Sequence, residues 1–240
     1  MRISVIGTGY VGLVAGTCLA DTGHRVICVD VDEERLARLK RGEMPIYEPG
    51  LEELLTRNIE EERLSFTGDT GDAVAKSLLV FLCVGTPSLE NGAHDVSALM
   101  DAAGQVARAM DGYRIIVNKS TGPAGTTARI AARMNELTDH EFDVVVNPEF
   151  MKEGAAVDDF LRPDRIVVGC EDVRVLEIMR QRERDMERKF SVEAEFAGLL
   201  RRTWRSITGG GPLVLTAVKK IRSELSRSTP TGTRYTTSSS

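Results

Sequence analysis

Residues 3–12 read ISVIGTGYVG, and residues 26–30 read VICVD. An apolar run that ends in G-x-G-x-x-G, a following helix of small residues and a second apolar run that ends in an acid predict a dinucleotide-binding turn. Gly7 permits the tight turn after the first strand, and Gly9 lets a pyrophosphate approach the backbone because it has no Cβ. Gly12 lets the helix pack close to the strand.

Asp30 indicates which dinucleotide this turn is expected to bind. An acid at the end of the second strand accepts hydrogen bonds from a ribose diol and repels the additional phosphate of NADP, so NAD is the expected cofactor. The free N–H groups at the start of the helix provide a site for the phosphates. A glycine-rich turn that binds nothing is the alternative, and the acid-tipped second strand argues against it.

The composition is typical of a globular protein. Among 240 residues, 42% are hydrophobic and 28% are charged, with a net charge of −5. The chain enters a strand at once without a signal peptide and has no apolar run of membrane-spanning length, so we expect a cytoplasmic protein with no membrane partner. Its four cysteines and three histidines lack the spacing of metal ligands, which predicts buried thiols and no metal site.

Apolar runs and helical patterns alternate along most of the chain, which predicts an α/β fold with a doubly wound, mostly parallel Rossmann sheet. The expected strands are 2–6, 25–30, 78–84, 114–118, 142–147 and 165–169. The expected helices are 10–22, 32–41, 50–57, 96–110, 124–137 and 171–189. We therefore assign residues 1–190 to one NAD-binding domain.

Residues 191–240 are expected to form an irregular basic tail, since they carry eight Lys and Arg against three Asp and Glu. Short helices are predicted at 199–204 and 213–225, followed by a disordered Ser/Thr-rich end from 226 to 240. The tail has no dense basic run and no interleaved aromatic residues, so no nucleic-acid partner is expected.

Polar residues and glycines follow three of the expected strands, at residues 85–87, 119–123 and 147–154. The carboxyl ends of parallel strands gather at one edge of the sheet, so these loops predict an active site beside the dinucleotide turn. Ordinary turn and capping chemistry would explain each loop taken singly.

Five segments carry a resemblance to a known family. They are GTGYVGL at 7–13, PIYEPGLEELL at 45–55, FLCVGTP at 81–87, KSTGPAGT at 119–126 and NPEFMKEGAAVDDFLRPDRIVVG at 147–169. Over residues 1–170 the chain resembles the NAD-binding domain of the UDP-glucose/GDP-mannose dehydrogenase family, and residues 45–50 and 119–121 are more similar to its UDP-glucose branch.

The resemblance implies NAD-dependent oxidation of the C6 alcohol of UDP-glucose, or a related nucleotide sugar, to the carboxylate of UDP-glucuronate. It implies that Glu149 is the base or water-orienting acid of the hydrolytic step and that Thr121 positions the water. The implied cofactor residues are Gly7, Gly9, Tyr10, Val11, Gly12, Asp30, Arg35, Thr86, Thr121 and Glu153. The implied substrate residues are Glu149, Phe150, Met151, Lys152 and Glu153.

Glu149 and Glu153 also have plainer interpretations. A glutamate after Pro148 can cap the next turn, and one near a helix start can be an ordinary first-turn charge.

The chain departs from the family pattern in two places. Gly122 stands where the family usually has Val. After residue 170 we find no match to the family's catalytic Lys and Asn or to its glycine-rich loop with the nucleophilic Cys, although oxidation of the aldehyde through a thioester requires a thiolate.

Three explanations of this departure are open: a truncated or frame-disrupted gene product, a half-enzyme that acts with a separate C-terminal partner, and a non-catalytic NAD-binding module. The basic tail favours the first. A Rossmann dehydrogenase for another class of substrate is a more distant alternative.

Overall fold

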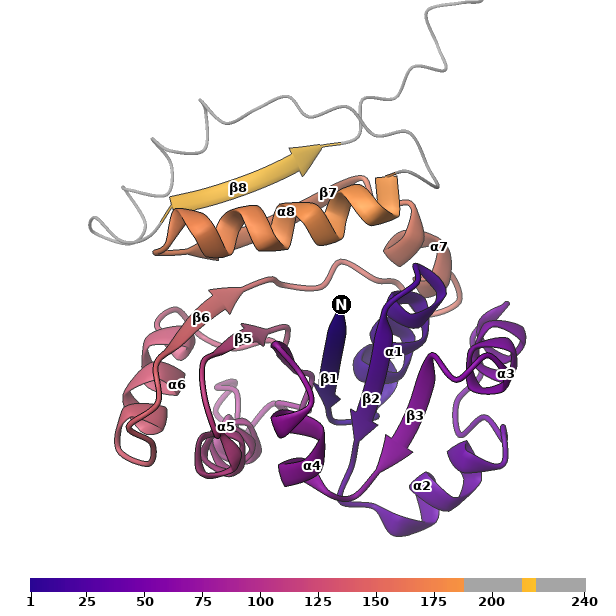
Figure 1. Ribbon diagram of the computed structural model, residues 1–240, viewed down its shortest axis with the longest axis horizontal. Helices are drawn as coiled ribbons and strands as arrows, with labels where there is room; N and C mark the ends of the chain where they lie inside the picture. The colour runs from indigo at the N-terminus through magenta and orange to yellow at the C-terminus, as the bar shows by residue number, and fades with distance from the viewer. Residues whose placement is uncertain (188–212, 219–240) are drawn as a thin grey trace, which may run out of the picture.

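The computed structural model describes residues 1–187 and 213–218 of the chain, which form a sheet covered by helices (Figure 1). The strands are β1 (Arg2–Ile6), β2 (Arg25–Val29), β3 (Leu64–Thr67), β4 (Leu79–Leu82), β5 (Arg114–Asn118), β6 (Phe142–Val146), β7 (Arg165–Cys170) and β8 (Leu213–Val218). The helices are α1 (Tyr10–Asp21), α2 (Glu33–Lys40), α3 (Leu51–Glu60), α4 (Thr70–Ala75), α5 (Ser97–Ala109), α6 (Thr126–Asn135), α7 (Ala156–Leu161) and α8 (Val173–Glu187).

In the described part of the chain, the strands form one sheet in the order β3-β2-β1-β4-β5-β6-β7-β8. The strands from β3 to β6 are parallel, whereas β7 pairs antiparallel with β6 and β8 pairs antiparallel with β7. Only one residue pair, Val146 and Gly169, joins β6 to β7, while six pairs join β7 to β8. The order reverses at β1 and β4, which is the crevice where doubly wound folds bind their ligands.

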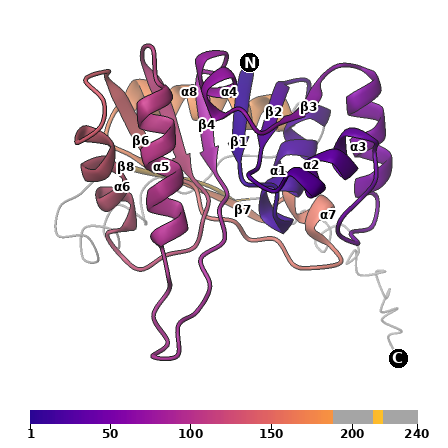
Figure 2. The same cartoon turned by 90° about the horizontal axis from the view of Figure 1, so that it is seen from below.

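Two hydrophobic clusters hold this architecture together, one on each face of the sheet. Helices α1, α2, α3, α7 and α8 contribute to one cluster, and α4, α5 and α6 contribute to the other. The central strands are buried on both faces, as continuous apolar strands of a parallel sheet should be. Ile3, Leu79 and Ile115 are fully buried in the first cluster, and Val80 and Ile116 are fully buried in the second. Figure 2 shows the helices on both sides of the sheet and a long connection from β4 to α5 that projects from the body.

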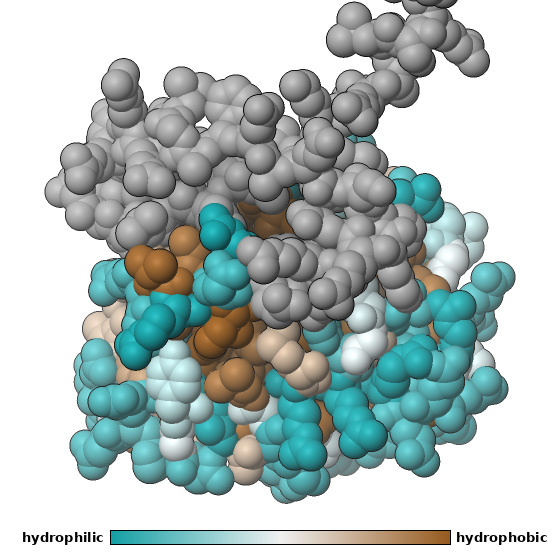
Figure 3. All heavy atoms as spheres, turned by 45° about the horizontal axis from the view of Figure 1, so that its top comes forward, coloured by the Kyte–Doolittle hydropathy of each residue, from teal (hydrophilic) through white to brown (hydrophobic). Residues whose placement is uncertain are grey.

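Outside these clusters the surface shown in Figure 3 is mostly hydrophilic, with one patch of hydrophobic side chains. Among the described helices, none is both long and apolar enough to cross a membrane.

Gly12 seats α1 directly on the turn that follows β1. A Cβ at Gly12 would lie 1.9 Å from the carbonyl oxygen of Gly7, which no side chain can do. Gly7 itself has a φ of +97°, a conformation that favours glycine. The two glycines therefore hold the start of α1 against the carboxyl end of β1.

The expected Rossmann architecture is confirmed, and all six predicted strands are present with shifts of a few residues at their ends. Three short elements, β3, α4 and α7, were not predicted. The helix predicted over 213–225 is wrong for residues 213–218, which form β8. Short apolar runs do not distinguish a helix from a strand, and here pairing with β7 decides the outcome.

The predictions for residues 199–204 and 226–240 lie outside the described residues. The domain boundary at residue 190 stays a prediction.

We expect Gly12→Ala to lower the free energy of unfolding by at least about 2 kcal/mol, because the added methyl group overlaps a backbone carbonyl that cannot move freely. Urea unfolding followed by circular dichroism measures this loss. Gly9→Ala is the matched control, since a Cβ there meets nothing within 4 Å and the φ of Gly9 is −66°. Equal stability of the two variants would contradict the close packing of Gly12 in α1 against the Gly7 carbonyl.

Candidate functional site

The turn from β1 to α1 leaves its backbone open where a dinucleotide phosphate is expected. Gly9 is the N-cap of α1; it is exposed, has no capping side chain, and has no atom within 4 Å of an added Cβ. The backbone N–H of Gly7 donates to the carbonyl of Val29 at 2.8 Å, so the turn is fixed to β2. Together these features leave the N–H groups at the start of α1 accessible to an anion.

Asp30 lies at the end of β2 and is 9% exposed. Its Oδ2 accepts hydrogen bonds from the backbone N–H of Thr8 at 2.7 Å and from the Thr8 hydroxyl at 2.6 Å. Its Oδ1 accepts from the backbone N–H of Asp32 at 3.0 Å, and an ionised carboxylate oxygen has room for a further donor. The residues present therefore fit a cofactor that offers a ribose hydroxyl at this position.

The pKa of Asp30 lies below its ordinary value. Burial by itself raises this pKa, but the hydrogen bonds from Thr8 and Asp32 and the nearby charge of Arg35 outweigh the cost of burial. Arg35 Nη1 lies 3.3 Å from Asp30 Oδ2, and the Arg35 side chain is only partly exposed. The structure thus brings together Asp30 and Arg35, two of the predicted cofactor residues.

A cleft of about 940 Å³ runs along β6 and α6 to the loops after β5 and β6, and it contains both predicted catalytic residues. Thr121 lines it from the loop after β5, and Glu149 lines it from the loop after β6. The Ser120 hydroxyl donates to the carbonyl of Val84 at 2.7 Å, which fixes the first loop to the chain after β4. Thr121 is exposed and Glu149 is half-buried, so both are accessible from the cleft.

The backbone N–H of Met151 donates to Glu149 Oε2 at 2.7 Å, so this side chain caps its own turn in the present structure. Phe150 and Met151 line a small neighbouring hollow of about 40 Å³ instead of the large cleft. Thr86, Lys152 and Glu153 line neither hollow, and Val11 lies beside Tyr10 in the first turn of α1. The predicted substrate residues are therefore divided between two adjacent hollows and the exposed loop.

Lys119 was missed by the sequence interpretation although it stands in a quoted motif. It is 6% exposed, its Nζ lies 3.5 Å from Asn147 Oδ1, and it lies 5.6 Å from the centre of the Phe160 ring. It lines both hollows and thereby puts a cationic side chain between them.

Glu48 is a second functional candidate that the sequence did not reveal. It is 5% exposed and accepts hydrogen bonds from the Tyr10 hydroxyl at 2.5 Å, from Gly154 N–H at 2.9 Å and from Ala156 N–H at 2.8 Å. Burial by itself raises the pKa of Glu48, but these donors and Val157 N–H bring it below its ordinary value. The PIYEPGLEELL segment was the only sequence signal for it.

All four cysteines of the chain lie among the described residues, and all four are buried. Burial raises the pKa of the Cys83 thiol to about 12 and that of the Cys170 thiol to about 11. Burial also raises the pKa of Cys18 and Cys28. None of them has the exposed, ionised form of a thiol nucleophile.

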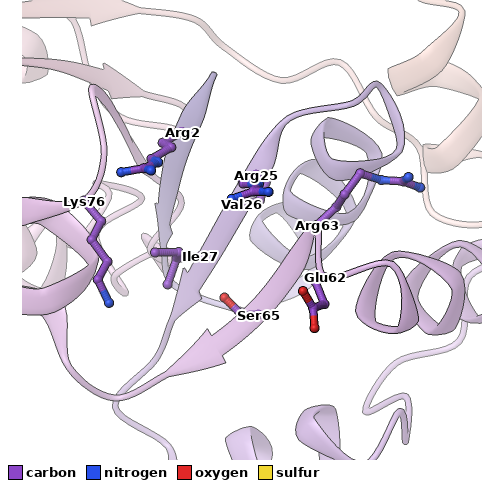
Figure 4. A pocket seen from close by; sticks show the side chains of 8 residues that line it. All are labelled: Arg2, Arg25, Val26, Ile27, Glu62, Arg63, Ser65 and Lys76. Carbon is purple, nitrogen blue, oxygen red and sulfur yellow. The ribbon is translucent and has the colours of Figure 1, made fainter.

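A separate hollow of about 300 Å³ lies at the amino ends of β1, β2 and β3 (Figure 4). It is lined by Arg2, Arg25, Val26, Ile27, Glu62, Arg63, Ser65 and Lys76. None of the predicted site residues borders it, so the candidate site is confined to the opposite edge of the sheet.

Comparison with protein families identifies the chain. The model of the UDP-glucose/GDP-mannose dehydrogenase family, NAD binding domain, matches residues 1–183. The chain therefore belongs to this family of oxidoreductases and contains its NAD-binding domain.

Known relatives agree with this assignment. A UDP-glucose 6-dehydrogenase of Rhizobium meliloti is 48% identical over an alignment of 187 residues, with 75% of this chain and 42% of that protein covered. A UDP-glucose 6-dehydrogenase of Pseudomonas aeruginosa is 46% identical over 190 residues, with 75% of this chain and 41% of that protein covered. The chain thus spans about two fifths of the length of these curated relatives.

Solved structures agree with the fold. The structure of a UDP-glucose dehydrogenase from the archaeon Pyrobaculum islandicum superposes with a TM-score of 0.73 at 40% identity, covering 78% of this chain and 43% of that one. A ternary complex of GDP-mannose dehydrogenase from Pseudomonas aeruginosa gives a TM-score of 0.74 at 35% identity, covering 77% of this chain and 44% of that one.

We expect Asp30→Asn to destabilise the fold by about 1.5–3 kcal/mol at neutral pH, because it weakens hydrogen bonds to a buried charged group. Because folding lowers the pKa of Asp30, its contribution is fully present above the unfolded-state pKa of about 3.9 and is lost as the pH falls through the folded-state value. Urea unfolding at neutral pH and in acid measures the difference between the two proteins.

Asp101→Asn is the control for this prediction, since Asp101 is exposed on α5. A stability difference for Asp30→Asn that is the same at both pH values would contradict the assigned role of its charge.

Proposed function

We propose that the chain serves the NAD-dependent oxidation of UDP-glucose to UDP-glucuronate, with NAD held at the turn between β1 and α1. The observation that carries this proposal is the common edge of the sheet: the open turn at Gly9, the acid Asp30 and the cleft with Thr121 and Glu149 all follow carboxyl ends of parallel strands. A bound NAD supplies the hydride acceptor of such a reaction.

The proposed cofactor roles follow from this geometry. The exposed backbone at Gly9 and the start of α1 receive the diphosphate, while Asp30 accepts hydrogen bonds from the adenosine ribose. Arg35, held against Asp30, borders the same ribose. Thr86 and Glu153 are proposed to complete the cofactor site from their loops.

The proposed substrate roles belong to the loop after β6. Glu149 acts as the base, or orients the attacking water, in the hydrolytic step, and Thr121 from the opposite loop positions that water. Residues 150–153 are proposed to line the sugar site. UDP-glucose is favoured over other nucleotide sugars because the two curated relatives with 46% and 48% identity are UDP-glucose 6-dehydrogenases.

The group that attacks the aldehyde in the second oxidation is proposed to come from outside the described residues. The buried thiols of Cys83 and Cys170 have pKa values of about 12 and 11, so neither supplies a thiolate near neutral pH. A separate C-terminal half that carries the nucleophile is the proposed partner.

A second candidate function is a non-catalytic NAD-binding module, and the four buried cysteines favour it. Activity after mixing with the C-terminal half of a relative separates the two functions. Recovery of UDP-glucose oxidation supports the half-enzyme, whereas NAD-dependent binding of another protein without any oxidation supports the module.

We expect isothermal titration calorimetry to detect NAD binding to the chain and weaker binding of NADP. Asp30→Ala should weaken NAD binding by about 1.5–3 kcal/mol, about a tenfold to hundredfold increase in Kd, because charge-assisted hydrogen bonds to the ribose are lost. Gly9→Ala should also weaken binding, because its methyl group stands where the diphosphate approaches, without loss of stability.

Asp101→Asn again serves as the control for charge. Unchanged NAD affinity in Asp30→Ala would remove Asp30 from the cofactor site.

We also expect no UDP-glucuronate from the chain alone with NAD and UDP-glucose, since the described residues offer no reactive thiolate. Chromatography of the nucleotide sugars and the absorbance of NADH measure the product and the hydride transfer. Two NADH formed per UDP-glucose by the isolated chain would contradict this expectation.

A further inference from the structure

Glu48 lies where two distant parts of the proposed site meet. Its side chain reaches the Tyr10 hydroxyl, 38 residues away in the sequence, and the backbone N–H of Gly154, 106 residues away. Tyr10 begins α1 beside the exposed Gly9, and Gly154 directly follows Glu153. One carboxylate therefore contacts both the proposed cofactor turn and the proposed substrate loop.

The carboxylate is held by hydrogen-bond donors instead of by a cation. Oε2 accepts from Tyr10 and Gly154, and Oε1 accepts from Ala156 N–H at 2.8 Å. Within the part of the chain that the structure describes, Glu48 forms no ion pair with a Lys or Arg. A buried carboxylate that loses its hydrogen-bond donors costs free energy. The fold therefore favours the conformation in which Tyr10, Gly154 and Ala156 keep their bonds to Glu48.

The loop also has hydrogen bonds of its own, from Lys152 N–H to Asp159 Oδ2 at 2.9 Å and from Ala155 N–H to the Lys152 carbonyl at 3.0 Å, but the N–H groups of Gly154 and Ala156 donate to Glu48. Gly154 has a φ of +85°, and α7 begins at Ala156 without a side-chain cap, so Glu48 supplies the acceptors at this turn. The Tyr10 hydroxyl also lies 3.4 Å from the carbonyl oxygen of Lys152. The turn at Gly154 is thus held partly by residues that are distant in the sequence, Glu48 and Tyr10.

We propose that Glu48 is a positioning residue that ties the cofactor turn, through Tyr10, to the loop that carries Glu149 and Glu153, so that NAD binding and the order of this loop are coupled. This inference rests on the proposed function for the identity of the two sites. The hydrogen bonds from Tyr10 and the loop to Glu48 exist without any ligand, so they are tested separately.

The first experiment compares hydrogen exchange of the backbone amides in Glu48→Gln and in the unchanged chain, without ligand. A glutamine offers one acceptor oxygen and places an NH2 group against a donor, so at least one bond to the loop is lost. We expect exchange in peptides over residues 152–157 to be at least about tenfold faster, while the central strands β1, β4 and β5 keep their protection.

Glu53→Gln, an exposed glutamate on α3, is the matched control and should leave the loop unchanged. Unaltered exchange over residues 152–157 in Glu48→Gln would overturn the proposal.

The second experiment uses Tyr10→Phe, which leaves the bonds between Glu48 and the loop amides in place and removes the hydroxyl that links the cofactor turn to Glu48 and to the Lys152 carbonyl. At NAD concentrations that saturate each protein in calorimetry, we expect NAD to slow exchange over residues 152–157 in the unchanged chain and not in Tyr10→Phe. If Tyr10 only stabilised the fold, the slowing of exchange by NAD would persist in Tyr10→Phe.

Tyr113→Phe is the control, because the Tyr113 hydroxyl also contacts a carboxylate, that of Asp143, at 2.7 Å. A full NAD response in Tyr10→Phe would overturn the coupling. Absence of any NAD binding to the unchanged chain, with loop protection still dependent on Glu48, would count against the proposed function and would support Glu48 as the residue that positions the loop.

Discussion

Helix α1 rests on the turn after β1 with no side chain between them, and the geometry of the candidate site depends on this contact. This close packing is possible because Gly12 has only a hydrogen where a Cβ would lie 1.9 Å from the Gly7 carbonyl oxygen. It sets the height of the helix above the sheet and the direction of its first residues. As a result Gly9 is exposed to an incoming phosphate, and Tyr10 points its hydroxyl toward Glu48.

Two buried carboxylates, Asp30 and Glu48, hold the backbone around this contact between helix and turn. Each accepts hydrogen bonds from backbone N–H groups and from one hydroxyl, and each has a pKa below its ordinary value. Backbone donors impose directions that a mobile Lys side chain would not. Thr8 and Gly154 are therefore fixed in orientation as well as in position, which preorganises the turn and the loop on either side of the proposed cofactor site.

The sequence was sufficient for the parts of the fold that depend on local chemistry. Gly7, Gly12 and Asp30 lie within one strand–helix–strand unit, so the fingerprint located the turn and the cofactor, while the family followed from five longer segments of the sequence. Glu48 was missed because its meaning depends on donors more than 100 residues away in the sequence. The strand β8 was taken for a helix because the choice depended on its pairing with β7.

The catalytic candidates were predicted as neighbours, and Thr121 and Glu149 do line one cleft. The sequence did not predict that residues 149–153 would be divided between two hollows and an exposed loop, because this division depends on packing around Lys119 and Phe160. Such contacts between the loop after β5 and helix α7 leave no periodic signal in a sequence.

The single residue pair between β6 and β7 divides the sheet into two ladders, a parallel one and an antiparallel one. Five parallel register pairs join β5 to β6, and six antiparallel pairs join β7 to β8, but only Val146 and Gly169 join the two groups. The large cleft crosses this seam, since Val146 lines it from one side and Gly169 and Glu171 line it from the other. The cleft therefore lies across the junction of the sheet that the fewest register pairs hold together, while the strands on either side of it are joined by five and six pairs.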